Sequence, residues 1–136
     1  GEHEIKIAGL ESKKKKLILD KDFKYSIWGQ EFQFVISISL ITHLPITLTE
    51  HCISSVAKIM APNGAFYFSF FLCDEFEYEK PVVQNNLGTV TYSDKDPYHQ
   101  TNKQILTIAK KNKLKFKYIG EWKHPRNQKM ACLTHE

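Results

Sequence analysis

The segment from residue 34 to residue 72 constrains the fold of this chain more than any other. It holds two apolar runs, Phe34–Ile38 and Ala65–Leu72, with a helix-patterned stretch between them. Strands that are apolar at consecutive positions are typical of a parallel sheet covered on both faces, and a helix is the usual connection in such a sheet. The sequence therefore predicts an α/β fold with these two runs as parallel central strands.

The stretch between the two runs carries helix signals. Thr47 and Glu50 have the spacing of a capping box at a helix start. The apolar residues recur at the spacing of one helix face: Cys52, Ile53, Val56, Ala57 and Met60. The Pro-Asn-Gly sequence at residues 62–64 predicts a turn that ends this helix.

The remainder of the chain predicts a long connection, a second helix and a hairpin. Residues 74–95 are polar and predict a lid or substrate loop, with a short strand at Thr89–Tyr92. Asp96-Pro97 predicts the start of a helix that ends near Asn112. Alternation at 114–118 and the run at 130–134 predict an antiparallel pair of strands. Upstream, Leu17–Leu19 predicts a short strand, and residues 4–10 fit either a strand or a helix end.

Charge argues against a nucleic-acid reader. The net charge is +4, but all 19 basic residues except Arg126 are Lys. Proteins that read nucleic acids rely on Arg for bidentate contacts with phosphate and guanine. We therefore expect no nucleic-acid partner, and we interpret the run Lys13–Lys16 as a solvated turn.

The lengths of the apolar runs and the spacing of the cysteines indicate the cellular compartment. No apolar run is long enough to cross a bilayer, and the N-terminus lacks a signal-peptide pattern, so no membrane partner is expected. Cys52, Cys73 and Cys132 are odd in number and far apart, which argues against a disulfide framework or a zinc ribbon and favours the cytoplasm. No histidines have metal-ligand spacing, so no metal site is expected. The chain begins with Gly1 rather than Met, which we interpret as an expression remnant or a truncation point.

The residues after the first apolar run form a set of motifs. Ser37 and Ser39 close the strand, and the corner Thr42-His43-Leu44-Pro45 follows. Residues 60–64 read Met-Ala-Pro-Asn-Gly, and residues 122–130 read Trp-Lys-His-Pro-Arg-Asn-Gln-Lys-Met. Together with Phe32-Gln33-Phe34-Val35, where Gln33 stands at a position that is often Asp in the family, these motifs resemble the later half of class I S-adenosylmethionine-dependent methyltransferases.

The resemblance implies a fold, a cofactor and a set of site residues. It implies a partial Rossmann-like methyltransferase sheet with a C-terminal antiparallel hairpin, and S-adenosylmethionine (SAM) as the cofactor. The cofactor-binding residues it implies are Asp22 and Phe23 at the adenine, with Asp20 as an alternative to Asp22, together with Ser37 and Ser39. The alternative for Asp22 and Phe23 is that both simply belong to a loop. His43 would then be a catalytic base, or alternatively a corner histidine bonded to backbone. His124 and Arg126 would hold an anionic acceptor, or alternatively brace the final hairpin.

The glycine-rich loop of that family is missing. The six glycines lie at positions 1, 9, 29, 64, 88 and 120, and no two are within five residues of each other. A loop whose backbone closely approaches the cofactor needs neighbouring residues without a Cβ. We therefore expect residues 1–136 to form a single truncated methyltransferase-like domain, a fragment or remnant of a SAM-dependent enzyme for a small molecule that is inactive alone.

Two consequences remain open. The alternative to a methyltransferase fragment is a non-catalytic interaction or scaffold module that uses the same fold. A sheet without its first strands would also have an unpaired edge, which is a template for pairing. We therefore expect either a homo-oligomer or an N-terminus in which residues 4–19 cover the gap.

Overall fold

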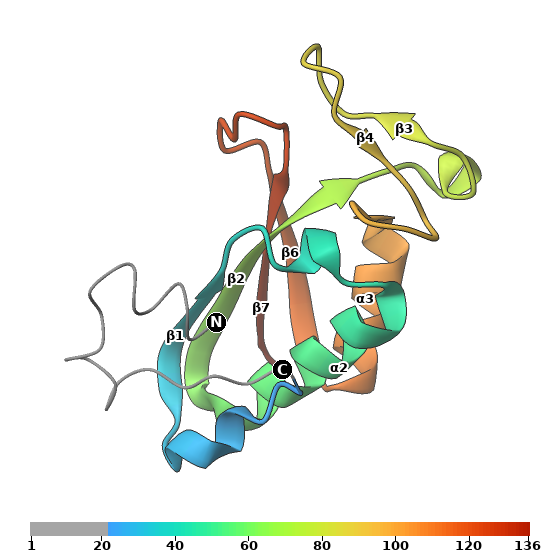
Figure 1. The fold of residues 1–136 in the computed structure, drawn as a ribbon. Coiled ribbons are helices and arrows are strands. Elements are labelled where there is room, and N and C mark those ends of the chain that lie inside the picture. The colour runs from blue at the N-terminus through green and yellow to red at the C-terminus, as the bar shows by residue number, and fades with distance from the viewer. Residues whose placement is uncertain (1–21) are drawn as a thin grey trace, which may run out of the picture.

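The computed structural model describes residues 22–136. The predictions for residues 4–10, 13–16 and 17–20 lie outside this range. The central sheet has the strand order β1-β2-β7-β6 (Figure 1). Its strands are β1 (Phe32–Ser37), β2 (Met60–Leu72), β6 (Leu114–Gly120) and β7 (Lys129–His135). β1 is parallel to β2, and β7 is antiparallel to both β2 and β6, so the predicted parallel pair and terminal hairpin are confirmed.

Two helices cover one face of this sheet, as Figure 1 shows for α2 (Ile46–Ile59) and α3 (Asn102–Lys111). The fully buried side chains between helices and sheet are Phe66, Phe68 and Phe70 of β2, Ile53 of α2, Ile105 of α3 and Leu133 of β7. Burying an apolar side chain of this size contributes roughly 1.5–3 kcal/mol, so this layer is the main source of stability. The predicted α/β class is confirmed.

The opposite face of the sheet is open around β1. Phe34 and Ile36 are 65% and 60% exposed. Phe34 stacks on Tyr67 of β2, with 5.1 Å between the ring centroids. The expectation of cover on both faces is therefore wrong for β1 within the described residues, because α2 and α3 both pack on the other face.

The start and end of α2 differ from the prediction. The helix begins at Ile46 with the extended Pro45 as its N-cap and no side-chain cap, so Thr47 lies inside the first turn and the predicted capping box is absent. The chain then passes directly into β2, where Phe32 pairs with Met60 and Phe34 pairs with Ala65. Residues 61–64 therefore form a bulge in the strand rather than a turn after the helix.

The start of α3 also differs. Thr101 and Gln104 form a reciprocal capping box, in which the Gln104 N–H donates to Thr101 Oγ1 (3.1 Å) and the Thr101 N–H donates to Gln104 Oε1 (2.9 Å). This pair starts the helix five residues after Pro97, so the start predicted at Asp96 is wrong. The residues between form β5 (His99–Gln100), which pairs with the end of β2. The predicted exit at Asn112 is confirmed.

The connection from β2 to α3 contains a small two-stranded sheet, β3 (Val82–Val83) and β4 (Val90–Thr91). β4 lies within the short strand predicted at Thr89–Tyr92. Buried polar groups hold this sheet to the domain: Gln84 Nε2 donates to the Leu72 carbonyl (3.0 Å) and to Thr91 Oγ1 (2.9 Å), and Thr91 Oγ1 bonds His99 Nδ1 (2.9 Å). The small sheet is therefore anchored to the end of β2.

Candidate functional site

A cavity of about 230 Å³ lies at the carboxyl ends of the parallel strands β1 and β2. This is the edge at which open α/β sheets bind their ligands. Its walls come from Ser39 just after β1, the 3-10 helix η3 (Ile41–His43), the end of β2, the connection from β2 to α3 and the loop between β6 and β7. The cavity brings together four of the predicted site residues: Ser39, His43, His124 and Arg126.

A buried amide forms one wall of the cavity. Gln128 is only 3% exposed. Its Oε1 accepts a hydrogen bond from Ser69 Oγ (2.6 Å), and its Nε2 donates to Ser39 Oγ (3.0 Å). The Ser39 N–H in turn donates to Ser69 Oγ (2.8 Å). This network ties the end of β1 to β2 and to the hairpin loop, and it holds Ser39 in a left-handed conformation with φ of 59°.

His43 faces a carboxylate from a distant part of the chain. Its Nδ1 lies 2.9 Å from both Oδ1 and Oδ2 of Asp96. Both side chains are more than half exposed, so the pair adds little to stability. Its effect is on the ring: a carboxylate at Nδ1 favours the tautomer with the proton on Nδ1 and leaves Nε2 able to accept a proton.

His124 has the opposite arrangement. Its Nδ1 accepts the backbone N–H groups of Arg126 (3.1 Å) and Gln128 (3.4 Å), so the proton of the neutral ring is on Nε2. Burial lowers the pKa of His124, and the charge of Arg126 lowers it further, while Glu121 acts in the other direction. His124 therefore braces the loop through one nitrogen and carries a hydrogen-bond donor on the other.

The remaining predicted site residues do not line this cavity. The Asp22 carbonyl oxygen lies 2.9 Å from His51 Nε2 on α2, and the Phe23 ring meets the His51 ring edge-on at 5.6 Å. Ser37 lies at the end of β1, and among the described residues its buried Oγ has no hydrogen-bond partner. The structure thus separates Asp22, Phe23 and Ser37 from the other four residues.

Three residues of the site were not identified from the sequence. Asp96 fitted a helix N-cap, and that interpretation obscured its pairing with His43. Ser69 is the one polar residue in the middle of the apolar run of β2, which is a signal that could have been used. Gln128 belongs to a motif noted in the sequence, but a buried amide that bonds two serines cannot be inferred from that motif.

Within residues 22–136, no group of three or more His, Cys, Asp and Glu side chains is placed to hold a metal ion. The helices in that same part of the chain are all too short or too polar to span a membrane.

Comparison with known proteins identifies the fold. No protein-family model and no curated protein sequence matches the chain significantly. Among solved structures, magnesium protoporphyrin IX methyltransferase from Synechocystis PCC 6803 with bound SAH matches 79% of this chain with a TM-score of 0.57 and 16% identity. An O-methyltransferase family protein from Burkholderia thailandensis matches 87% of this chain with a TM-score of 0.62 and 9% identity. The chain has a class I methyltransferase-like fold.

The methyltransferase-like chain spans only part of these proteins. It covers 47% of the length of the Synechocystis enzyme and 35% of the Burkholderia protein. A structure described as a pericyclic reaction enzyme matches 79% of this chain with a TM-score of 0.57 and 13% identity, and the chain covers 27% of it. The fold alone therefore does not assign the reaction.

The cavity is small and has no glycine in its lining. The cavity of about 230 Å³ is smaller than the roughly 300–1,000 Å³ of pockets that enclose a drug-sized ligand. None of its lining residues is a glycine, so every residue there carries a Cβ that limits close backbone approach. The buried, unbonded Oγ of Ser37 is a polar group whose partner is not among the described residues.

Proposed function

We propose that this domain is the acceptor-side portion of a SAM-dependent methyltransferase that acts on a small molecule. The observation that carries the proposal is the convergence of His43, His124 and Arg126 on one cavity at the carboxyl ends of β1 and β2. We further propose that residues 1–136 are a single truncated domain, inactive alone. Two observations support this: the sequence has no glycine-rich loop, and the cavity of about 230 Å³ is below the roughly 300–1,000 Å³ of pockets that enclose a drug-sized ligand.

His43 is the catalytic residue in this proposal. With its Nδ1 proton held by Asp96, the Nε2 lone pair can take a proton from the nucleophilic group of an acceptor. Asp96 is a positioning residue, since it acts only through the ring of His43. The alternative, a corner histidine bonded to backbone, has less support because the recorded partner of Nδ1 is a carboxylate.

His124 and Arg126 would recognise the acceptor. Arg126 provides a cation in the cavity wall, and a neutral His124 offers the N–H of Nε2. A guanidinium and a neutral donor together favour a small anion such as a carboxylate. We therefore propose a small acceptor that carries a carboxylate next to the group to be methylated.

Fewer residues support the part of the proposal that concerns binding of the methyl donor, SAM. Ser37 is the last residue of β1 and Ser39 lies two residues later in the cavity wall, and the unbonded Oγ of Ser37 supports a contact to a group outside the described residues. The adenine role of Asp22 and Phe23 stays a prediction, because both lie beside His51 rather than at the cavity. SAM would be held only when a donor-side partner supplies the rest of the cradle.

Salicylate, which has a carboxylate beside a hydroxyl, is a suitable probe of this cavity. In amide NMR spectra of the full chain, millimolar salicylate should shift the signals of Ser39, His43 and Arg126. Arg126→Gln should weaken this binding by about tenfold, as expected for loss of one charged hydrogen bond, while Lys103→Gln on α3 serves as the matched control. Shifts that avoid the cavity, or equal loss in both variants, would contradict the proposal.

The alternative function is a non-catalytic interaction module on the same fold. The observation that favours it is the open apolar surface around Phe34 and Ile36. A chain that does not bind salicylate but associates through this surface would support that alternative.

We propose that the protein resides in the cytoplasm, because the thiols of Cys52, Cys73 and Cys132 are free and buried. Burial raises the pKa of Cys52 to about 11 and that of Cys73 to about 12.

A further inference from the structure

One wall of the cavity comes from the turn between β3 and β4. Thr89, the residue just before β4, lines the cavity together with His43 and Arg126. It belongs to the segment 74–95, for which the sequence predicts a lid or substrate loop. We propose that Thr89 is a specificity-determining residue, whose hydroxyl binds a polar group of the acceptor other than the carboxylate and the methylated atom. This inference rests on the proposed function, since it concerns the acceptor of the same cavity.

Among the described residues that line the cavity, Thr89 carries the one hydroxyl whose proton has no recorded acceptor. The other two hydroxyls donate within the protein, from Ser39 Oγ to Gln128 Oε1 (3.3 Å) and from Thr42 Oγ1 to the Ser39 carbonyl (3.0 Å). Thr89 Oγ1 accepts a hydrogen bond from Asn85 Nδ2 (3.1 Å). Because a hydroxyl has one proton and two lone pairs, Thr89 can still donate one hydrogen bond and accept another.

The turn holds this hydroxyl in place. Asn85 Oδ1 accepts the backbone N–H groups of Leu87 (2.9 Å) and Thr89 (3.2 Å), as in an Asx turn. The Gln84 N–H donates to the Thr89 carbonyl (2.8 Å). The side chain of Gln84 is buried and donates to the Leu72 carbonyl at the end of β2. Thr89 is therefore preorganised, so that binding a ligand costs it little conformational entropy.

Thr89 is also tied to the loop that carries Arg126. Asn127 Nδ2 donates to the Gln84 carbonyl (2.8 Å), and the Gln84 N–H donates to the Thr89 carbonyl. Two hydrogen bonds through one residue thus connect the neighbour of Arg126 with Thr89. The separation between the guanidinium-bearing loop and this hydroxyl is set by the fold, so an acceptor that reaches both must carry polar groups at a matching separation.

Apolar side chains lie among these polar groups. Phe71 is buried at the end of β2, and Pro97 and Pro125 line the cavity from two connections. An apolar lining with a few placed polar groups is typical of sites for small molecules. The acceptor class that fits is a small ring compound with a carboxylate, a nucleophilic group beside it and a further hydroxyl.

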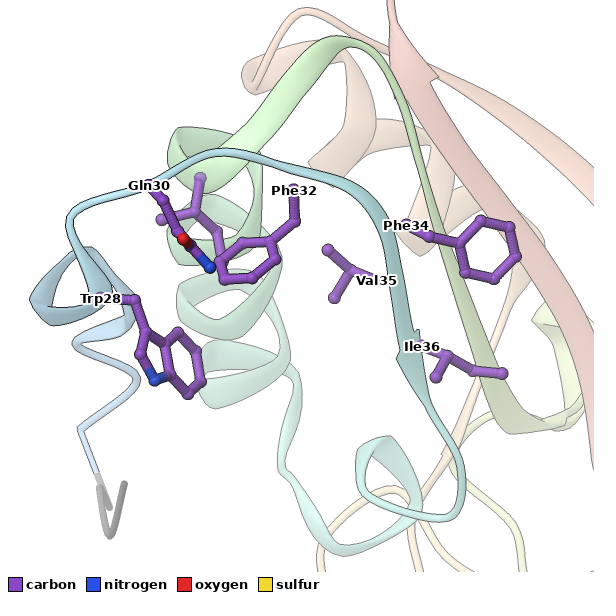
Figure 2. Close-up of a pocket in the computed structure, with 7 residues that line it drawn as sticks. Trp28, Gln30, Phe32, Phe34, Val35 and Ile36 are labelled. Carbon is purple, nitrogen blue, oxygen red and sulfur yellow. The ribbon is translucent and has the colours of Figure 1, made fainter. Parts of the chain in front are cut away.

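A larger hollow beside β1 has no comparable set of polar groups. It measures about 600 Å³, and its lining has no charged residue and a single amide, that of Gln30 (Figure 2). Figure 2 shows the other side chains around the strand, with Val35 on one side of β1 and Phe34 and Ile36 on the other. Selective sites need several polar groups that fix the orientation of a ligand. The smaller cavity provides them, and this hollow does not.

Dihydroxybenzoates test the proposal against salicylate. Suitable isomers keep the carboxylate and the neighbouring hydroxyl of salicylate and add a second hydroxyl at each remaining ring position in turn. Amide NMR titration of the full chain measures the dissociation constants. At least one isomer should bind roughly threefold to tenfold more tightly than salicylate, as expected for one added hydrogen bond.

Variants of Thr89 show whether this gain comes from its hydroxyl. Thr89→Val replaces the hydroxyl by a methyl group and should remove the gain, whereas Thr89→Ser should keep it. Thr107→Val is the matched control, because Thr107 on α3 is exposed and likewise gives up one side-chain hydrogen bond, to the Lys103 carbonyl (2.9 Å). A purely structural role of Thr89 would weaken salicylate and the preferred isomer alike and leave the ratio of their dissociation constants unchanged.

Other outcomes would overturn the proposal. If no isomer binds more tightly than salicylate, Thr89 makes no contact with the acceptor. A gain that persists in Thr89→Val would place the added hydroxyl elsewhere, and a gain that Thr107→Val also removes would have a cause outside the cavity. Salicylate that shifts the cavity signals without any gain for an isomer would contradict this inference alone, whereas salicylate that does not bind would contradict the proposed function as well.

Discussion

Two histidines on the same cavity wall differ in which ring nitrogen carries the proton. His124 accepts two backbone N–H groups at Nδ1, whereas His43 places Nδ1 against the carboxylate of Asp96. Backbone donors at Nδ1 fix the proton of the neutral His124 ring on Nε2, whereas a carboxylate at Nδ1 favours the His43 tautomer with its proton on Nδ1. The cavity wall therefore holds two imidazole rings of opposite tautomer.

The pKa of His124 should lie below 6.5. Burial is the main cause and the charge of Arg126 the second, so Arg126→Gln should raise the pKa of His124 towards 6.5. As the pH falls below 6.5, the unfolded chain binds a proton at His124 before the native chain does, so this residue lowers the free energy of unfolding as the solution becomes acidic. NMR titration of the imidazole signals measures this pKa, and a value above 6.5 in the parent chain would contradict the assignment.

At the scale of elements, the site depends on the connection between the end of β1 and the β6–β7 hairpin. Gln128 makes this connection through Ser39 and Ser69. No other described side chain is recorded with hydrogen bonds to both serines. The geometry of the cavity should therefore be sensitive to this one amide.

Gln128→Leu should lower the free energy of unfolding by about 1–3 kcal/mol. The substitution keeps the volume of the side chain roughly constant but removes the hydrogen-bond partners of two serines. Urea denaturation measures the change, and Asn86→Leu at an exposed position is the control. If both variants lost the same small amount, Gln128 would not hold the hairpin.

Much of the element order could be predicted from the sequence, but the starts of the two helices could not. The apolar runs and helical spacing located β1, α2, β2 and β7, since burial on one face leaves a periodic pattern. The helix starts were missed because competing local signals lay close by: Pro45 displaced the cap expected at Thr47, and the Thr101–Gln104 pair displaced Asp96. The exposure of β1 was missed because an apolar run has the same sequence whether or not another element covers it.

The site likewise contains residues that were expected from the sequence and residues that were not. Ser39, His43, His124 and Arg126 were expected as site residues only through the resemblance to methyltransferases, and the structure places all four on one cavity. Asp96 could not be expected there, because 53 residues separate it from His43 and its position depends on how the β2–α3 connection folds back. Local patterns do not contain such long-range pairings.

At the scale of the whole molecule, the described chain is a sheet with one covered face and one open face. The helices α2 and α3 cover one side, and the cavity lies at the carboxyl end of the parallel pair (Figure 1). The methyltransferase-like neighbours are two to four times longer than the part this chain matches. Within the described residues, Phe34 and Ile36 on the open face of β1 are 65% and 60% exposed.

Calorimetric titration of SAM into the full chain tests the central claim most directly. The account predicts no binding heat with SAM at up to about 1 mM, because the 136 residues contain no glycine-rich loop to hold the methyl donor. One-to-one binding with a micromolar dissociation constant would contradict it, since the chain would then hold the methyl donor without a partner.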